Sequence, residues 1–173
     1  YHCILDDYIV DNIEFISSKQ IATLLKIDDS QVRKDINILN NSGKCRVGYI
    51  VKELKKSIEK TLGFAKKKNA FIIGAGNLGM ALAKYDNFTN YGLNIIALFD
   101  NDKKKIGGTI NYKMVLDIEK LPNLARKTNV DIAILTVPKA FAQSTADFLV
   151  KANIKYIWNF APVVLNVPDD VQV

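Results

Sequence analysis

Two different hydrophobic patterns divide the sequence near residue 68. Before that point apolar residues recur at helical spacing, and the first such segment predicts an amphipathic helix built on Tyr1, Ile4, Leu5, Tyr8, Ile9 and Ile13. From Ala70 onward, short apolar runs alternate with amphipathic stretches; the runs are AFIIG, NIIALFD, DIAILTV and YIWNF. Such runs separated by helices are typical of a parallel sheet covered on both faces. We therefore expect a helical first part followed by an α/β part.

Capping signals within the first part predict a helix-turn-helix. Ser17 with Gln20 fits a capping box, and the helix that it starts stops near Ile27. Residues 28–30 offer a second N-cap, and the apolar side of the next helix, which Gly43 ends, consists of Val32, Ile36 and Leu39. Residues 44–49 could form a short hairpin or wing. This order is the winged helix-turn-helix pattern, with a small helical cap or dimerisation domain as the alternative.

Polar residues on the third predicted helix are candidates for DNA contact. They fall away from its apolar positions, and they are side chains able to reach base edges and phosphates: Gln31, Arg33, Lys34 and Asn37. The formal charge of the chain is +6, and residues 18–68 hold thirteen Lys and Arg against five Asp and Glu. A local excess of this kind suits a polyanion, although a solvated lysine-rich surface gives the same count.

A further apolar seam follows the predicted wing and has helical spacing. Its members are three and four residues apart: Val51, Leu54, Ile58 and Leu62. We expect a linker helix here, over residues 51–68, whose seam could pack against a partner subunit.

The segment FIIGAGNLGMALAKY, residues 71–85, resembles a dinucleotide phosphate loop in its spacing and its context. Gly74 permits the tight turn out of a strand, Gly76 lets the backbone approach a pyrophosphate, and Gly79 lets helix and strand pack closely. The next strand ends in Asp100, 21 residues past Gly79 and close to the expected separation of about 20. A carboxylate there accepts hydrogen bonds from ribose hydroxyls and repels a 2′-phosphate, which favours NAD(H). The lysines at 103–105 are either a solvated loop or a neutraliser of phosphate.

Residues able to perform dehydrogenase chemistry are missing from the α/β part. It has no Tyr-x-x-x-Lys pair, the single histidine is His2, and neither cysteine lies in it. Two segments at strand ends are expected to line the nicotinamide half of the dinucleotide site, with ordinary loops as the alternative. They supply Thr136, Val137, Pro138, Asn159 and Phe160. No apolar run approaches the roughly 20 residues of a membrane span, and we expect a cytoplasmic protein with no metal site.

Seven stretches in order along the chain resemble the Rex family of redox-sensing transcriptional repressors of bacteria. They are ISSKQIA, SQVRKD, VGY, GAGNLGMALAKY, FDNDKKKIG, TVPKAFAQ and NFAPVVLNVPDDVQV. The resemblance implies a homodimer, with a winged helix-turn-helix domain at 1–50, the linker helix, and a Rossmann-like doubly wound parallel sheet at 69–173. It implies a repressor that binds operator DNA when NADH is low and releases it when NADH binds.

Site residues follow from the same resemblance. The NAD(H) loop maps to Gly74, Ala75, Gly76, Asn77, Leu78 and Gly79, with Asp100 on the ribose. DNA contacts map to the recognition helix, from Ser30 through Gln31, Arg33 and Lys34 to Asn37, and to Lys44 and Arg46 of the wing.

The chain departs from the family pattern at two places. INILNNSG, residues 36–43, replaces an aromatic-glycine run, and Cys45-Arg46 replaces an Arg-Gly pair in the wing. The family also continues past VPDDVQV into a helix that swaps between subunits. Two alternatives remain open, a small NAD-dependent oxidoreductase with a helical cap and a nucleotide-sensing paralogue that no longer binds DNA.

Overall fold

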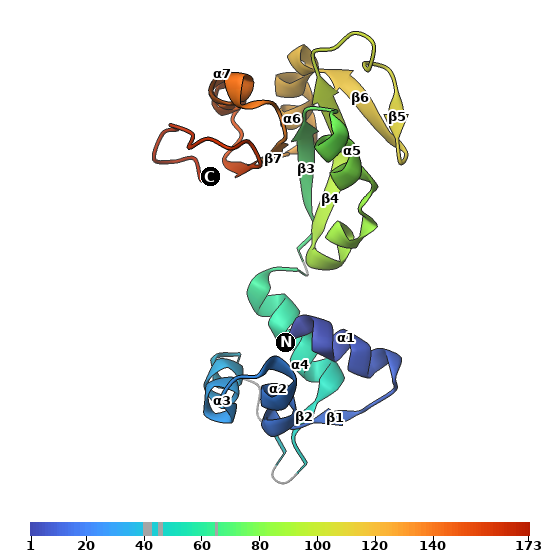
Figure 1. Cartoon of the computed structure of the whole chain (residues 1–173), viewed down its shortest axis with the longest axis vertical. Helices are drawn as coiled ribbons and strands as arrows, with labels where there is room; N and C mark the ends of the chain where they lie inside the picture. Colours follow the sequence, from blue (N-terminus) through green and yellow to red (C-terminus); the bar gives the residue numbers. More distant parts are fainter. Residues whose placement is uncertain (40–42, 45–46, 65) are drawn as a thin grey trace. The chain divides into compact units, whose positions relative to one another are not determined.

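The computed structural model describes residues 1–39, 43–44, 47–64 and 66–173. It divides into two compact units, Tyr1–Ala65 and Lys66–Val173 (Figure 1). None of the described helices is long and apolar enough to cross a membrane.

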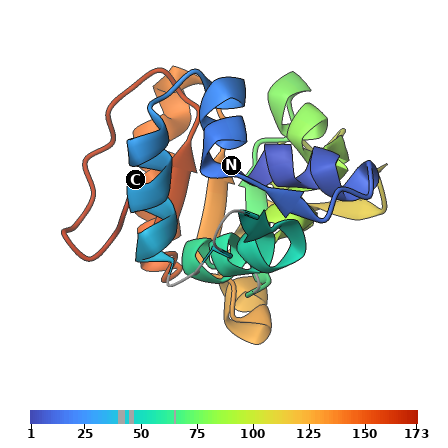
Figure 2. The same cartoon turned by 90° about the horizontal axis from the view of Figure 1, so that it is seen from below.

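The first unit is a small helical domain with a two-stranded sheet. Its elements are α1 (His2–Val10), β1 (Phe15–Ile16), α2 (Ser18–Leu25), α3 (Asp29–Ile38), β2 (Tyr49–Ile50) and α4 (Val51–Leu62). α2 and α3 lie side by side (Figure 2), and α1 packs against α4. Every helix and β1 contribute buried side chains to one apolar core, against which Tyr49 of β2 packs partly buried. The core is formed by Leu5, Ile16, Ile21, Ala22, Val32, Ile36, Val51, Leu54 and Ile58. This arrangement places α2 and α3 as a helix-turn-helix.

The predicted caps of α2 and α3 are confirmed. The Ser17 hydroxyl accepts a hydrogen bond from the Gln20 amide at 3.2 Å, and Gln20 Oε1 accepts one from the Ser17 amide at 2.8 Å. Asp28 caps α3 by accepting from the Ser30 amide at 2.7 Å. α3 ends at Ile38 rather than at Gly43, because the Leu39 amide bonds to the Ile36 carbonyl and tightens the last turn.

The prediction for the first helix was too long. α1 ends at Val10, Asn12 adopts a left-handed φ of 55°, and Ile13 is 41% exposed. The chain then forms β1, which pairs antiparallel with β2 through Phe15 opposite Ile50. The two strands lie more than thirty residues apart in the sequence, so no local pattern predicts this pairing. Lys44 and Gly48 form an antiparallel bridge ahead of β2, as a wing requires.

α4, expected as a separate linker, belongs to the first unit. Val51, Leu54 and Ile58 are 0–5% exposed within that unit's own core, whereas Leu62 is 59% exposed. The expectation that this seam packs against a partner subunit is therefore wrong for its first three residues, because α1 and the other elements of the same unit already cover them.

The second unit is a doubly wound sheet, as predicted. Its elements are β3 (Lys68–Ile73), α5 (Asn77–Lys84), the 3₁₀ helix η1 (Asp86–Tyr91), β4 (Leu93–Asp100), β5 (Thr109–Ile110), β6 (Lys113–Asp117), the 3₁₀ helix η2 (Ile118–Lys120), α6 (Leu121–Thr128), β7 (Ile132–Leu135), α7 (Lys139–Lys151) and β8 (Tyr156–Asn159). The strand order is β5-β6-β4-β3-β7-β8, and every pairing except β5 with β6 is parallel.

Apolar side chains cover both faces of this sheet. On one face α5 contributes Ala83 to a core with Ile72, Leu98 and Ile134. On the other face α6 and α7 pack over a core that includes Phe71 and Phe99. The chain continues from β3 to β4 on one side and returns to β7 on the other, so the strand order reverses at β3. Ligands of such sheets bind at this switch point, outside the carboxyl ends of the strands.

Candidate functional site

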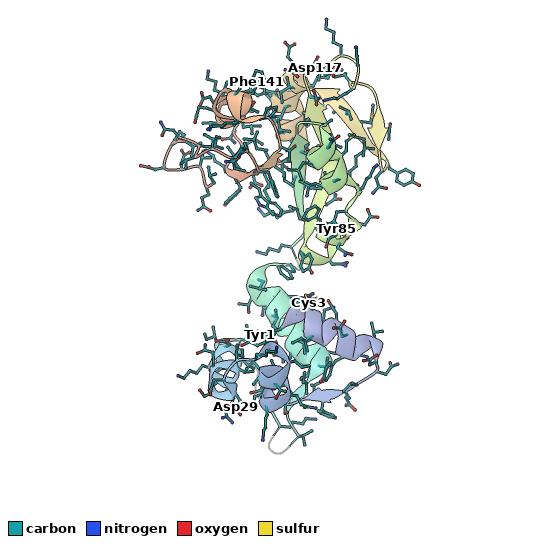
Figure 3. The ribbon with its side chains drawn as sticks, viewed as in Figure 1. Tyr1, Cys3, Asp29, Tyr85, Asp117 and Phe141 are labelled. Carbon is teal, nitrogen blue, oxygen red and sulfur yellow. The ribbon has the colours of Figure 1, made fainter. Side chains whose placement is uncertain are left out.

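A cavity of about 710 Å³ lies at the carboxyl ends of the strands in the second unit. This volume is within the range usual for small-molecule sites. Figure 3 shows Phe141 and Asp117 at this end of the unit and Tyr85 at the other end. The lining consists of Ile73, Gly74, Gly76, Leu78, Phe99, Asp100, Asn101, Asp102, Lys105, Ile118, Thr136, Val137, Pro138, Phe141, Ser144, Thr145 and Phe160.

The three loop glycines have different surroundings, and an added side chain would have a different effect at each. Gly74 has a φ of +104°, and a Cβ there would lie 2.9 Å from the Thr136 carbonyl oxygen. A Cβ on Gly79 would lie 1.9 Å from the Gly74 carbonyl oxygen, so the first turn of α5 can pack on the loop only without a side chain. Gly76, in contrast, has no atom within 4 Å of such a Cβ. Gly76 therefore faces open space in the cavity.

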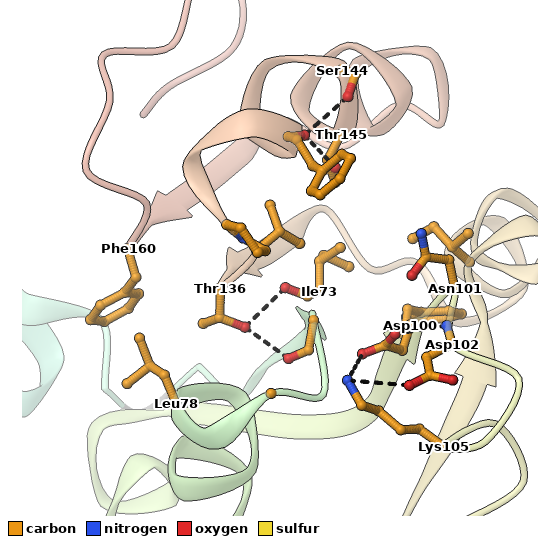
Figure 4. Close-up of a pocket in the computed structure, with 17 residues that line it drawn as sticks. Ile73, Leu78, Asp100, Asn101, Asp102, Lys105, Thr136, Ser144, Thr145 and Phe160 are labelled. Atoms are coloured by element: carbon orange, nitrogen blue, oxygen red, sulfur yellow. Dashed lines mark hydrogen bonds and ion pairs between the residues drawn. The ribbon is translucent and has the colours of Figure 1, made fainter.

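Thr136 joins the end of β7 to the glycine loop. Its hydroxyl lies 2.9 Å from the carbonyl oxygens of both Ile73 and Gly74 (Figure 4). The backbone after β7 is thereby fixed against the loop, and Pro138 then begins α7 as its N-cap.

Asp100, the last residue of β4, has a side chain that is only 8% exposed. Its Oδ2 accepts from the Ala75 amide at 2.8 Å and from Lys105 Nζ at 3.2 Å, and its Oδ1 accepts from the Asp102 amide at 2.9 Å. Burial raises the pKa of this carboxyl, but the amides of Asp102 and Ala75 and the Lys105 ammonium outweigh burial, so the pKa lies below its ordinary value. Asp100 is thus a carboxylate at neutral pH.

Opposite ends of the cavity differ in chemistry. Asp100, Asp102 and Lys105 line one end, and Phe160 and Leu78 line the other (Figure 4). An elongated ligand with a polar and an aromatic end fits this division.

Most of the residues predicted to bind a nucleotide line the cavity, and four do not. The Ala75 amide is occupied by Asp100, Gly79 packs beneath the loop, and Asn77 is the first residue of α5. Asn159 instead shapes the turn after β8, donating to the Val163 carbonyl at 2.8 Å and accepting from the Ala161 amide at 2.9 Å.

Sequence reasoning missed a set of lining residues on α7. Phe141, Ser144 and Thr145 have the spacing of one helix face, three and four residues apart, and this spacing is the signal that could have found them. The cavity lining contains no His, Cys or Tyr. Groups of His, Cys, Asp or Glu able to hold a metal ion are also absent from the described part of the chain.

A row of aromatic side chains extends from the cavity across the second unit. Phe160 contacts Trp158, Trp158 contacts Phe88, and Phe88 contacts Tyr85, with centroid separations of 5.1, 5.9 and 5.1 Å. Trp158 is 46% exposed and Tyr85 is 50% exposed. Large aromatic side chains on a surface are more typical of contact sites than of a free face.

The candidate DNA-contacting surface of the first unit is the polar side of α3. The structure places its predicted residues on the exposed side of the helix: Ser30, Gln31, Arg33, Lys34 and Asn37. Arg33 is paired with Asp29 one turn back, at 2.6 Å. In the wing, Lys44 Nζ lies 5.5 Å from the centroid of the Phe15 ring. Arg46 lies outside the described residues.

α3 is also tied to the start of α1. Asp35 accepts from the Gln31 side-chain amide at 2.7 Å and from the Tyr1 hydroxyl at 2.5 Å. Burial and the Asp35 carboxylate together raise the pKa of Tyr1 to about 12. This contact fixes the orientation of α3 within the unit.

Comparison with known proteins gives matches to both units. A family described as the CoA binding domain matches residues 65–163, and one described as a putative DNA-binding protein N-terminus matches residues 1–37. The redox-sensing transcriptional repressor Rex of Treponema denticola is 47% identical over 163 residues, covering 94% of this chain and 78% of that protein.

Three solved structures of RSP, a Rex-family repressor, are also similar, two of them with a nucleotide bound. The complex of RSP with β-NAD⁺ and operator DNA has a TM-score of 0.92 at 40% identity, covering 100% of this chain and 81% of RSP. The complex of RSP with β-NADH has a TM-score of 0.88 at 41% identity, covering 100% of this chain and 82% of RSP.

Proposed function

The chain belongs to the Rex family of redox-sensing transcriptional repressors, and on this premise we propose that it is an NADH-responsive repressor. In this proposal the second unit binds NAD(H) and the first unit binds operator DNA. DNA is bound when NADH is low and released when NADH binds.

One observation carries this proposal. A helix-turn-helix and a dinucleotide-type cavity, whose glycine loop faces a buried carboxylate, occur in a single chain. The first can read DNA, the second can hold a redox cofactor, and the family joins the two tasks.

The cavity fits NAD(H) residue by residue. Gly76 leaves backbone space for the pyrophosphate at the N-terminus of α5, where the helix dipole favours negative charge. Asp100 would hold the adenosine ribose. Phe160 and Leu78, at the aromatic end, would flank the nicotinamide together with the segment from Thr136 to Pro138. When bound, NAD(H) supplies the redox signal, and the chain's own residues only bind and orient it.

DNA contact would use the exposed residues of α3, with Lys44 and Arg46 of the wing on the flanking backbone. We also propose that the protein acts as a homodimer, as the family resemblance implies, and the exposed aromatic row from Phe160 to Tyr85 supports a contact surface on the second unit. Because operator DNA and the NADH pool of a bacterium share the cytoplasm, we place the protein there.

Two alternatives to the proposal are CoA as the ligand and dehydrogenase as the activity. The description of one matching family names CoA, whose ribose carries a 3′-phosphate that the Asp100 carboxylate would repel. A dehydrogenase would need a proton donor, and the lining offers no His, Cys or Tyr for that role. We therefore propose that the protein is not an enzyme.

Fluorescence anisotropy with the operator duplex recognised by RSP provides the test, with a shuffled duplex of the same composition as control. We expect binding at low salt, release by NADH, and far weaker release by NAD⁺ or CoA. NADH binding without any DNA binding would instead indicate a sensing paralogue. Failure of the folded protein to bind NADH, or release by CoA alone, would contradict the proposal.

A further inference from the structure

The three lysines after Asp100 are not equivalent in the structure. All three side chains are exposed, that of Lys105 to 42%, so exposure does not distinguish them. The ammonium groups of Lys103 and Lys104 have no hydrogen-bond or ion-pair partner among the described residues. Lys105 instead lines the cavity, 3.2 Å from Asp100 Oδ2 and 4.0 Å from Asp102 Oδ2 (Figure 4). The turn that returns Lys105 to this position is closed by its own amide, which donates to the Asp102 carbonyl at 2.9 Å.

Asp100 has limited capacity for a ribose in this arrangement. Each carboxylate oxygen accepts about two hydrogen bonds. Oδ2 already accepts two, from Ala75 and Lys105, and Oδ1 accepts one, from Asp102. A ribose that donates both hydroxyl groups to this carboxylate must therefore take the position of Lys105 on Oδ2. The displaced ammonium then lies beside the ribose oxygens, with its own donors available.

Lys105 also changes the charge that a ribose meets. Asp100 and Asp102 carry two negative charges at this end of the cavity, and the Lys105 ammonium offsets one of them. A phosphate on the ribose is repelled by carboxylates and attracted by an ammonium a few ångströms away.

We propose that Lys105 is a specificity-determining residue, which weakens the discrimination of this site against a ribose phosphate. The inference rests on the proposed NAD(H) site. It holds that the parent protein binds NADPH measurably, although more weakly than NADH, and that Lys105 is the reason. The ligand class is thus a nicotinamide dinucleotide with a free or phosphorylated adenosine ribose.

The test is a titration of NADH and NADPH fluorescence with the full chain and three variants at one ionic strength. Lys105→Met should weaken NADPH binding more than NADH binding. The ratio of the NADPH dissociation constant to the NADH dissociation constant should rise by about threefold to tenfold, which is the effect of one nearby charge on a phosphate close to the surface. Lys105→Arg keeps the charge and should keep the parent ratio. Lys103→Met removes the same charge from a side chain that does not line the cavity, and it should leave the ratio within about twofold of the parent value, because solvent and salt screen a more distant charge more strongly.

Each other result overturns the inference. It fails if Lys105→Met shifts the ratio no further than Lys103→Met does, if Lys105→Met strengthens NADPH binding, or if the parent protein shows no NADPH binding at millimolar nucleotide. Those results leave the proposed function intact so long as NADH binds. If the folded parent binds neither nucleotide, the proposed function fails first and the inference fails with it. Circular dichroism of each variant without ligand confirms the fold.

Discussion

Gly76 is the loop position where a side chain would enter the cavity rather than meet the protein. A Cβ there has no atom within 4 Å, whereas one on Gly79 would lie 1.9 Å from a backbone oxygen. We therefore expect Gly76→Val to abolish NADH binding while leaving the melting temperature near that of the parent. Gly79→Val is the matched control, and it should lower the melting temperature because backbone must shift. NADH titration and thermal unfolding check both, and parent-like NADH affinity in Gly76→Val would contradict the assigned site.

At this scale the sequence could predict residues whose roles depend on their immediate neighbours. The conformation of Gly74 and the place of Asp100 at a strand end are of this kind. The partner of Asp100 could not be predicted, because the choice of Lys105 over Lys103 depends on how the following turn closes. Likewise, the loss of the Ala75 amide to Asp100 requires two segments brought together by the sheet.

The start of α2 depends on the capping box of Ser17. Its hydroxyl accepts from an amide that otherwise has no partner in the helix, so Ser17→Ala should destabilise the first unit by about 0.5–2 kcal/mol. Thr23→Ala, in the interior of the same helix, is the control, because alanine is the better helix former there. Thermal unfolding of the full chain measures both, and NADH affinity should stay unchanged. Equal stability of the two variants would show that the cap contributes nothing measurable.

α3 offers two basic residues with different expected roles. Arg33 must exchange its ion pair with Asp29 for a base edge, and Arg33→Ala should cost about 1–3 kcal/mol of operator binding and relax sequence preference. Lys34→Ala should weaken binding evenly across sequences and flatten the salt dependence, as a phosphate contact does. Anisotropy with operator and shuffled duplexes separates the two effects. A loss in Arg33→Ala that is the same for both duplexes would contradict base reading by Arg33.

Elements with strong local signals were predictable, and elements made by distant pairing were not. The capping residues located α2 and α3 because a cap acts within four residues. β1 and β2 have two residues each, too few for any periodicity, and exist only because they pair with each other. The β5–β6 hairpin and α6 were also missed: β5 has only two residues, and α6 has no side-chain cap of the kind that located α2 and α3. For α4 the seam predicted the helix correctly but could not say that α1 covers it.

The division of the chain into a helical unit and an α/β unit could be predicted because their hydrophobic patterns differ: helical spacing in the first unit and short apolar runs in the second. Near-continuous apolar strands demanded a sheet buried on both faces, and the two cores beside that sheet meet the demand. A nucleotide site and a DNA-binding domain in one chain can act as a switch only if binding at one changes the affinity of the other. This coupling free energy is a property of the whole molecule and not of either unit alone.

Linkage requires the influence to be reciprocal. If NADH weakens operator binding by some factor, operator DNA must weaken NADH binding by the same factor, and a coupling of about 1–3 kcal/mol is ordinary for such a switch. We expect DNA titrations with and without saturating NADH, and NADH titrations with and without saturating operator, to give equal factors. Gly76→Val should keep operator binding yet lose its response to NADH, because the cavity can no longer accept the pyrophosphate while the first unit is unchanged. Release of Gly76→Val from DNA by NADH would place the sensing site elsewhere on the molecule.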